Sequence, residues 1–263
     1  MKGIILAGGL GTRLLPMTRV TNKHLLPVYD RPMIYYPIQQ MVHAGIRDIL
    51  VVTGGDHAGD FLKLLRNGQE FGLHQLGYAY QDGEGGIAEA LGLARHFVDR
   101  EPIMVMLGDN IFQNPIAPAV EAFRSVGTGA QILVKEVDDP HRFGVARIED
   151  GQVVEVVEKP ADPPSRLAVT GCYFYDEQVW DIIDGLSPSR RGELEITDVN
   201  NHFIRAGSMR HQVIDGWWTD AGTLDSLRRA ANLVVGESGN PVLTGFQDAL
   251  RMNGSGDVAE SGV

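Results

Sequence analysis

Short apolar runs alternate with longer stretches of helical spacing through the first half of the chain. The apolar runs predict strands at 2–7, 48–54, 75–81, 102–110 and 130–137. The stretches between them predict helices at 32–45, 57–67, 85–97 and 116–126. Strands that alternate with helices are typical of βαβ units, so we expect a largely parallel sheet with helices on its faces.

The pattern changes near residue 139. Residues 143–159 are predicted to form two strands joined by the turn signal Glu149-Asp150-Gly151, and 166–176 a further strand. Helices at 176–184, 194–206 and 223–235 and a strand at 210–214 follow. We expect this half to complete the same sheet and to add a small β-rich lobe.

Together these elements predict an α/β fold of Rossmann-like type, with three α/β/α layers and a mixed, mostly parallel central sheet. Residues 1–235 are expected to form one domain, with halves at about 1–138 and 139–235. From 236 to 263, Gly, Ser, Asn and acidic residues dominate, which predicts a flexible C-terminal tail.

Composition narrows the classes of function. The hydrophobic fraction of 43% and the charged fraction of 22% are those of a soluble globular protein, with no apolar run long enough to span a bilayer. A net charge of −11 argues against a nucleic-acid partner, which needs a basic face. The single Cys172 excludes an intrachain disulfide framework, so a reduced cytoplasmic setting is expected.

The segment GGLGTR at 8–13 follows the first predicted strand and has three interpretations. As a dinucleotide fingerprint it fails, because Leu14 stands where the third glycine is needed, and as a Walker A loop it lacks the Gly-Lys-Ser/Thr step. It could be a tight turn without a ligand. It could also bring backbone N–H groups up to nucleotide phosphates, with Arg13 as a fixed cation.

Eight motifs in register carry a resemblance that favours the phosphate-binding interpretation. They are GGLGTR (8–13), NKHLLP (22–27), DRPMIYYP (30–37), LGDNIF (107–112), EKP (158–160), VTGCYFYD (169–176), RGELEITD (191–198) and WTDAGT (218–223). Together they resemble the sugar-1-phosphate nucleotidyltransferases from residue 1 to about 235.

The resemblance implies a Mg²⁺-dependent enzyme that uses dTTP and α-D-glucose 1-phosphate and releases dTDP-glucose and pyrophosphate, at the start of deoxysugar synthesis. A homo-oligomer, tetramer or dimer, is also implied. In this reaction the sugar phosphate attacks the α-phosphorus in line. Because both reactants are anions, cations and positioning carry most of the catalysis.

The resemblance also implies roles for individual residues. Arg13, Lys23 and Lys159 are the catalytic cations: Arg13 meets the departing phosphates, Lys23 the α-phosphate and Lys159 the sugar's phosphate. Asp109 lies at the carboxyl end of a predicted central strand, where open α/β sheets bind ligands, and with Asp220 it is expected to hold Mg²⁺.

The remaining implied residues divide between the two substrates. The nucleotide set is Gly8, Gly9, Leu10, Gly11, Thr12, Arg13, Lys23, Gln81, Gly86 and Asp109, with Gln81 and Gly86 at the pyrimidine edge. The sugar-phosphate set is Asn110, Gly144, Glu158, Lys159, Val169 and Arg191. Each of these residues could instead have a purely structural role, such as a turn glycine, a strand-core position or a surface salt bridge.

Three other functions are compatible with parts of the sequence. The same chemistry could use UTP or another hexose 1-phosphate, since thymine and uracil differ by one methyl group worth only ~1–3 kcal/mol. A catalytically inactive nucleotide-sensing subunit is disfavoured by the joint presence of the implied cations and carboxylates. A nicotinamide-binding oxidoreductase is disfavoured by the incomplete dinucleotide fingerprint.

Overall fold

Parallel strands form the centre of the protein in the computed structural model, which describes residues 1–237. Strand β1 (Lys2–Ala7) lies between β4 (Asp48–Gly54) and β6 (Ile103–Leu107) and runs parallel to both. Its apolar residues are buried on both faces, as expected for a strand covered by helices on each side.

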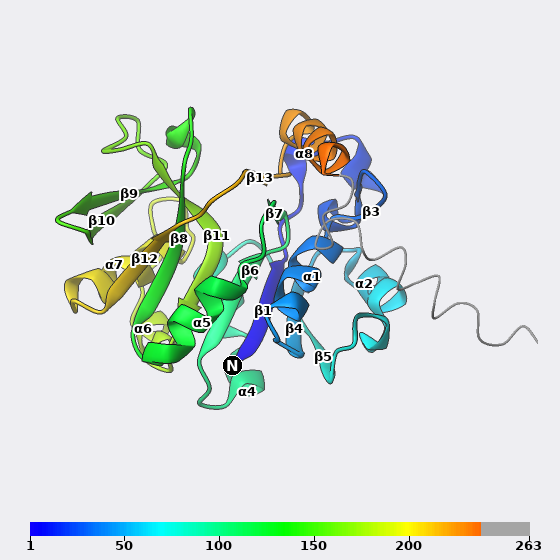
Figure 1. The fold of residues 1–263 in the computed structure, drawn as a ribbon. Coiled ribbons are helices and arrows are strands. Elements are labelled where there is room, and N and C mark those ends of the chain that lie inside the picture. The colour runs from blue at the N-terminus through cyan, green and yellow to red at the C-terminus, as the bar shows by residue number, and fades with distance from the viewer. Residues whose placement is uncertain (238–263) are drawn as a thin grey trace, which may run out of the picture.

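A single nine-stranded sheet runs through both halves of the chain (Figure 1). Its main path is β10-β9-β11-β6-β1-β4-β5, and β8 and β12 extend from β11. The remaining strands of this sheet are β5 (Gln75–Gln81), β8 (Ala130–Glu136), β9 (Gly144–Glu149), β10 (Gln152–Glu158), β11 (Leu167–Tyr175) and β12 (Met209–Val213). Only β10 and β11 run against the other strands, which confirms the predicted mixed, mostly parallel sheet.

Helices cover the sheet as two outer layers because side chains along each strand alternate between its faces. Ile4 and Leu6 of β1 pack into one core with helices α3 (Ile87–Gly92), α4 (Arg95–Val98), α6 (Val179–Asp184) and α7 (Ile196–Arg205). Ile5 and Ala7 pack into a second core with α1 (Tyr35–His43), α2 (Ala58–Leu65) and α5 (Ala117–Val126). The three predicted layers are therefore present.

A smaller third core lies under α8 (Leu224–Gly236), the orange helix at the top of Figure 1. Helix α8 packs on two short ladders, one of β2 (Pro27–Val28) with β3 (Arg31–Pro32) and one of β7 (Asn110–Phe112) with β13 (Trp218–Asp220). These ladders bring the N-terminal segment, the segment after β6 and the chain before α8 together.

Three predicted elements have other boundaries. The helix predicted at 32–45 begins only at Tyr35, because Pro32 pairs with Pro27 in the β2–β3 ladder. The helix predicted at 85–97 is divided into α3 and α4, and the strand predicted at 102–110 ends at Leu107. Most of the predicted C-terminal tail lies outside the described residues. Within residues 1–237, no helix has the length and apolarity needed to cross a membrane.

Candidate active site

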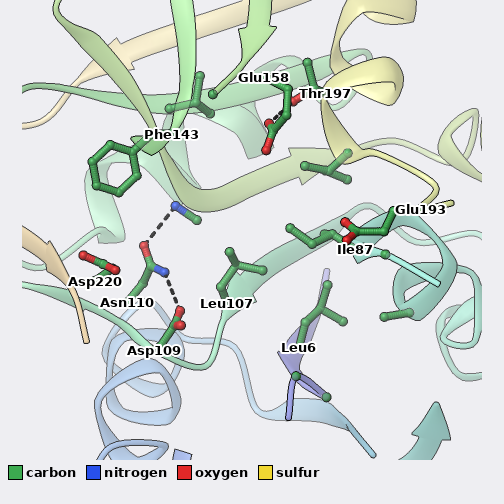
Figure 2. A pocket seen from close by; sticks show the side chains of 18 of the residues that line it. Leu6, Ile87, Leu107, Asp109, Asn110, Phe143, Glu158, Glu193, Thr197 and Asp220 are labelled. Carbon is green, nitrogen blue, oxygen red and sulfur yellow. Dashed lines mark hydrogen bonds between the residues drawn. The ribbon is translucent and has the colours of Figure 1, made fainter. Parts of the chain in front are cut away.

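A cavity of about 360 Å³ opens where β1, β5 and β6 end. This is the edge at which open α/β sheets bind ligands. On this side the cavity is lined by Leu6 of β1, Gln81 of β5 and Leu107 of β6. From the other half of the chain it is lined by Gly144 of β9, Glu158 of β10 and Val169 of β11. Figure 2 shows Glu158 and Thr197 facing Asp109 and Asp220 across the cavity.

The glycine turn after β1 leads into a single 3-10 turn at Thr12–Leu14 rather than a long helix, so it is not a dinucleotide fingerprint. Gly11 has a φ of 68°, and a Cβ there would lie 2.9 Å from side-chain carbons of Lys23 and Thr18. Leu14 is fully buried and anchors the turn, whereas Arg13 beside it is exposed and lines the cavity.

Lys23 and Asp109 form an ion pair at the floor of the cavity, with 2.6 Å between Lys23 Nζ and Asp109 Oδ2. Both side chains are largely buried. Burial alone would raise the pKa of Asp109, but the Lys23 ammonium beside it holds that pKa well below its ordinary value. Asp109 is therefore a carboxylate, and the two remaining Lys23 donors are left for another acceptor.

The β7–β13 ladder brings Asp220 to Asp109 although 111 positions separate them in the sequence. Asp220 pairs with Asn110 across the ladder, and Ala221 N–H donates to Asp109 O. A Cβ on Gly222 would lie 3.3 Å from Oδ2 of each aspartate, so the two oxygens are at most twice that distance apart. Both carboxylates therefore converge on one point, and Arg13 Nη2 lies 3.4 Å from it.

Arg142 is a third cation at the carboxylate pair, after Lys23 and Arg13. Its Nη2 lies 3.2 Å from Asp220 Oδ2, and its Nη1 donates to Asp139 at 2.9 Å. The residue belongs to the 3-10 turn Pro140–Arg142 that precedes β9, so it joins the second half of the chain to β13.

Asn110 connects Asp109 to strands β11 and β13 at the floor of the cavity. Its Oδ1 accepts from Gly171 N–H at 3.0 Å and from Trp218 Nε1 at 2.7 Å, and its Nδ2 donates to Asp109 Oδ1 at 3.0 Å. Figure 2 draws the bond from Asn110 to Asp109. The Asn110 carboxamide is thus engaged in holding Asp109 and β13.

His24 lies behind the ion pair and is 2% exposed. Its burial, together with the positive charge of Lys23, lowers its pKa from 6.5 to about 3. Nδ1 of the ring lies 2.8 Å from Asn22 Oδ1, and a Cβ on Gly108 would lie 2.7 Å from ring atom Cδ2. The imidazole is therefore neutral and tightly packed.

Gln81 and Gly86 lie together at one end of the cavity. Gln81 is 6% exposed, and its Nε2 donates to Gly86 O at 3.2 Å. Gly86 has a φ of 100°, and a Cβ there would lie 2.5 Å from Leu194 O. Only glycine fits this close crossing of the two segments.

Glu158 lies at the opposite end, at the close of β10. Its Oε2 accepts from Thr197 Oγ1 at 2.7 Å, and its Oε1 lies 3.3 Å from Lys159 Nζ. Lys159 has a φ of 41°, a left-handed conformation uncommon for a side-chain-bearing residue. Its N–H donates to Phe143 O, which fixes the lysine at the rim.

Most of the residues implied by the sequence line this one cavity: Gly8, Gly9, Arg13, Lys23, Gln81, Gly86, Asp109, Asn110, Gly144, Glu158, Lys159, Val169 and Asp220. The cavity wall does not include Leu10, Gly11, Thr12 or Arg191. Arg191 Nη2 lies 2.7 Å from a carboxylate oxygen of Glu195, 3.3 Å from one of Glu193 and 3.6 Å from one of Glu158.

Sequence reasoning missed Arg142, Phe143, Tyr173, Glu193, Thr197 and Trp218, which also line the cavity. Four of them lie within the motifs named above: Tyr173 in VTGCYFYD, Glu193 and Thr197 in RGELEITD, and Trp218 in WTDAGT. Arg142 and Phe143 directly precede Gly144, which the sequence predicts to be a site residue. Their position next to it is the signal that could have identified them.

Comparison with known proteins places this chain in a family. The model of the nucleotidyl transferase family matches residues 2–236. The chain belongs to the nucleotidyl transferase family.

Relatives of this nucleotidyl transferase include a glucose-1-phosphate thymidylyltransferase of Neisseria meningitidis. It is 44% identical over 238 residues, which cover 89% of this chain and 82% of the relative. A Bacillus anthracis structure, provisionally assigned as a glucose-1-phosphate thymidylyltransferase and solved in complex with a sucrose, is 52% identical with a TM-score of 0.85. The match covers 89% of this chain and 94% of that one.

A UDP-glucose pyrophosphorylase structure in complex with UDP-glucose shares the fold of this nucleotidyl transferase. It has a TM-score of 0.77 at 24% identity and covers 90% of this chain and 98% of that one.

The carboxylates of this nucleotidyl transferase suit one kind of metal site. Among the described residues, no three His, Cys, Asp or Glu side chains form a group that could enclose a metal ion. Mg²⁺ takes one or two protein carboxylates and fills its remaining positions with water and substrate phosphates. Asp109 and Asp220 could each supply one carboxylate oxygen to such an ion, and each is paired with a cation here, Asp109 with Lys23 and Asp220 with Arg142.

Proposed function

We propose that this chain transfers the thymidylyl group of dTTP to α-D-glucose 1-phosphate and releases pyrophosphate. The supporting observation is the convergence of Arg13, Lys23, Asp109, Lys159 and Asp220 on one cavity. The choice of dTTP and glucose 1-phosphate is supported by relatives that match over most of the chain and are named glucose-1-phosphate thymidylyltransferases.

In the proposed reaction an oxygen of the sugar phosphate attacks the α-phosphorus of dTTP. The bond from the α-phosphorus to the bridging oxygen breaks, and pyrophosphate leaves with that electron pair. No covalent enzyme intermediate is needed, so the residues act by neutralising charge and holding the two anions in line.

Each cation has a place in this scheme. Lys23, fixed by Asp109, directs its remaining donors at the α-phosphate, and Arg13 binds the β- and γ-phosphates because a guanidinium matches phosphate geometry. Lys159 at the rim holds the phosphate of the sugar. Arg191 would join it only after exchanging a carboxylate partner for phosphate.

Asp109 and Asp220 would hold Mg²⁺, which when bound supplies positive charge to the triphosphate. The pairing of Arg142 with Asp220 and of Lys23 with Asp109 orients both carboxylates.

The two ends of the cavity suit the two organic groups. Gln81 and the Gly86 backbone offer the amide-type groups that a pyrimidine edge requires, and Gly8 leaves room beside them. The Glu158 carboxylate and the Thr197 hydroxyl oxygen at the other end offer acceptors for sugar hydroxyls, with Gly144 and Val169 as backbone neighbours.

Pyrophosphate release with dTTP, UTP, CTP, ATP and GTP, each with several hexose 1-phosphates and Mg²⁺, tests this proposal. We expect the highest kcat/KM for dTTP with glucose 1-phosphate. Release only with UTP or with another sugar phosphate would keep the chemistry and replace the substrates. Silence from folded protein across every pair would favour an inactive sensing subunit instead.

A further inference from the structure

The Gln81 carboxamide is held in one orientation by two acceptors on the same side. Its Nε2 donates to Gly86 O at 3.2 Å and to Glu89 Oε1 at 3.1 Å. If the amide were turned over, its oxygen would face both of these oxygens and two hydrogen bonds would be lost. The amide nitrogen therefore points to Glu89, and Oε1 is left for the cavity side.

Oε1 of Gln81 lies at the cavity wall beside Gly8. A Cβ on Gly8 would lie only 2.7 Å from this oxygen, so the missing side chain leaves the acceptor uncovered. Gln81 and Gly8 both line the cavity, and Gln81 is 6% exposed. No described residue donates a hydrogen bond to this oxygen, so a ligand that displaces water from it must supply an N–H or leave the acceptor unpaired.

Glu89 keeps its place because Gly85 has no side chain. Glu89 lies in the first turn of α3, and a Cβ on Gly85 would lie 1.6 Å from Glu89 Oε2. Glu89 does not itself line the cavity. Among the described residues, its contact with the cavity wall runs through the amide of Gln81.

We propose that Glu89 is a positioning residue for base selection. By fixing the Gln81 amide with its oxygen toward the cavity, Glu89 makes the site accept bases with an N–H at position 3 and reject cytosine. Thymine and uracil donate from N3, whereas N3 of cytosine is an acceptor and would oppose the Gln81 oxygen. The inference rests on the proposed function, in which a pyrimidine nucleotide binds at this end of the cavity.

The test compares dUTP with dCTP, which differ at the base edge and not by a 5-methyl group. Isothermal titration without sugar phosphate measures the ratio of their Kd values for wild type, Glu89→Ala, Glu89→Gln and Gly85→Ala. Glu121→Ala, an exposed acidic residue on α5, is the matched control.

We expect wild type and Glu121→Ala to prefer dUTP by tenfold or more. Glu89→Ala should lower that preference about tenfold, since the amide is then free to turn over. Glu89→Gln should retain most of it, because its carbonyl oxygen still accepts from Gln81. Gly85→Ala, which displaces the carboxylate, should resemble Glu89→Ala.

An unchanged ratio in folded Glu89→Ala, or equal losses for both nucleotides, would overturn the inference and leave Glu89 a structural residue. Wild type without a preference would overturn it as well. If Glu89→Ala did not fold, Gly85→Ala would decide. The binding ratio does not depend on turnover, so absence of thymidylyl transfer by wild type would count against the proposed function alone.

Discussion

At the residue scale, a neutral histidine behind a buried ion pair defines the cavity floor. Lys23 is paired with Asp109 and directly precedes His24, and the Lys23 ammonium acts on the pKa of both neighbours. It lowers the pKa of His24 and that of Asp109, so the group carries one positive and one negative charge near neutral pH. Asp109 thus holds Lys23 in a fixed position at the floor of the cavity, ready to bind an anionic ligand.

Replacing Lys23 by Ala should lower kcat about 10²- to 10³-fold, because the charge that faces the attacked phosphate is removed. Steady-state rates of sugar nucleotide formation measure this, with circular dichroism as the test of folding. Lys63→Ala is the matched control, since Lys63 lies on the surface and pairs only with Asp60 among the described residues. Folded Lys23→Ala within threefold of wild type would contradict the assigned role.

His24 predicts a pH dependence of stability. The folded-state pKa of about 3 lies below the ordinary 6.5, so between these values the unfolded chain binds a proton that the folded chain does not. Stability therefore falls as pH falls from about 6.5, by about 1.4 kcal/mol per pH unit. From pH 6 to 4, wild type should lose about 2–3 kcal/mol more than His24→Gln.

Denaturant unfolding at several pH values measures the difference. His74→Gln, at an exposed position, controls for the loss of a histidine, and it should keep the wild-type slope. Parallel pH profiles for wild type and His24→Gln would show that His24 is protonated in the folded state.

At the element scale, very short elements position the second carboxylate. Three residues of β13 bring Asp220 to β7, and α8 begins only four positions after Asp220. Thr223 caps that helix in a capping box: its Oγ1 accepts from Ser226 N–H at 3.2 Å, and Ser226 Oγ accepts from Thr223 N–H at 3.0 Å. The cap fixes the start of α8 and therefore the path of the chain between Asp220 and that helix.

Thr223→Ala should therefore destabilise the protein by about 1 kcal/mol, the usual cost of losing an N-cap side chain. Thr223→Ser keeps the hydroxyl and should stay within a few tenths of wild type. Chemical denaturation of the three proteins gives both values. Equal stabilities for Ala and Ser would mean that the capping box adds nothing.

The elements also show what could be predicted from sequence. Strands β1, β4 and β6 were predictable because their side chains are buried on both faces, which leaves unbroken apolar runs. The two- and three-residue ladders were not, since so few residues carry no periodicity. The break between α3 and α4 leaves the helical spacing of apolar residues largely intact, so the pattern alone predicted one helix.

The candidate site, too, could be predicted from the sequence only in part. Asp109 was predictable from its place after a buried strand, whereas Asp220 was implied only by resemblance, because its approach to Asp109 depends on the β7–β13 ladder. Arg142 was missed since its contact with Asp220 spans 78 positions and leaves no local pattern.

At the scale of the whole molecule, the sheet joins the two halves of the chain. Strand β11 of the second half pairs with β6 of the first along Cys172–Tyr175, and the cavity lies beside this junction. The chain carries a net charge of −11, yet Arg13, Lys23, Arg142 and Lys159 all line the cavity. Anionic ligands thus meet local cations on a protein that otherwise repels them.

Because the sheet is continuous, residues 1–235 should unfold as one cooperative unit. All three tryptophans, at 180, 217 and 218, lie in the second half, so their fluorescence reports on that half, while far-UV circular dichroism reports on both. We expect the two urea transitions to coincide. Separated midpoints would indicate two domains that unfold independently.

The central claim is that one cavity joins a thymidylyl group to a sugar phosphate. Phosphorus NMR of the protein with equal amounts of dTTP, glucose 1-phosphate and Mg²⁺ tests it most directly. We predict that the dTTP and sugar phosphate signals decline together while the coupled diphosphate pair of dTDP-glucose and the pyrophosphate signal grow in equal amounts. Pyrophosphate or phosphate released without a sugar nucleotide, or an unchanged spectrum from folded protein, would contradict the account.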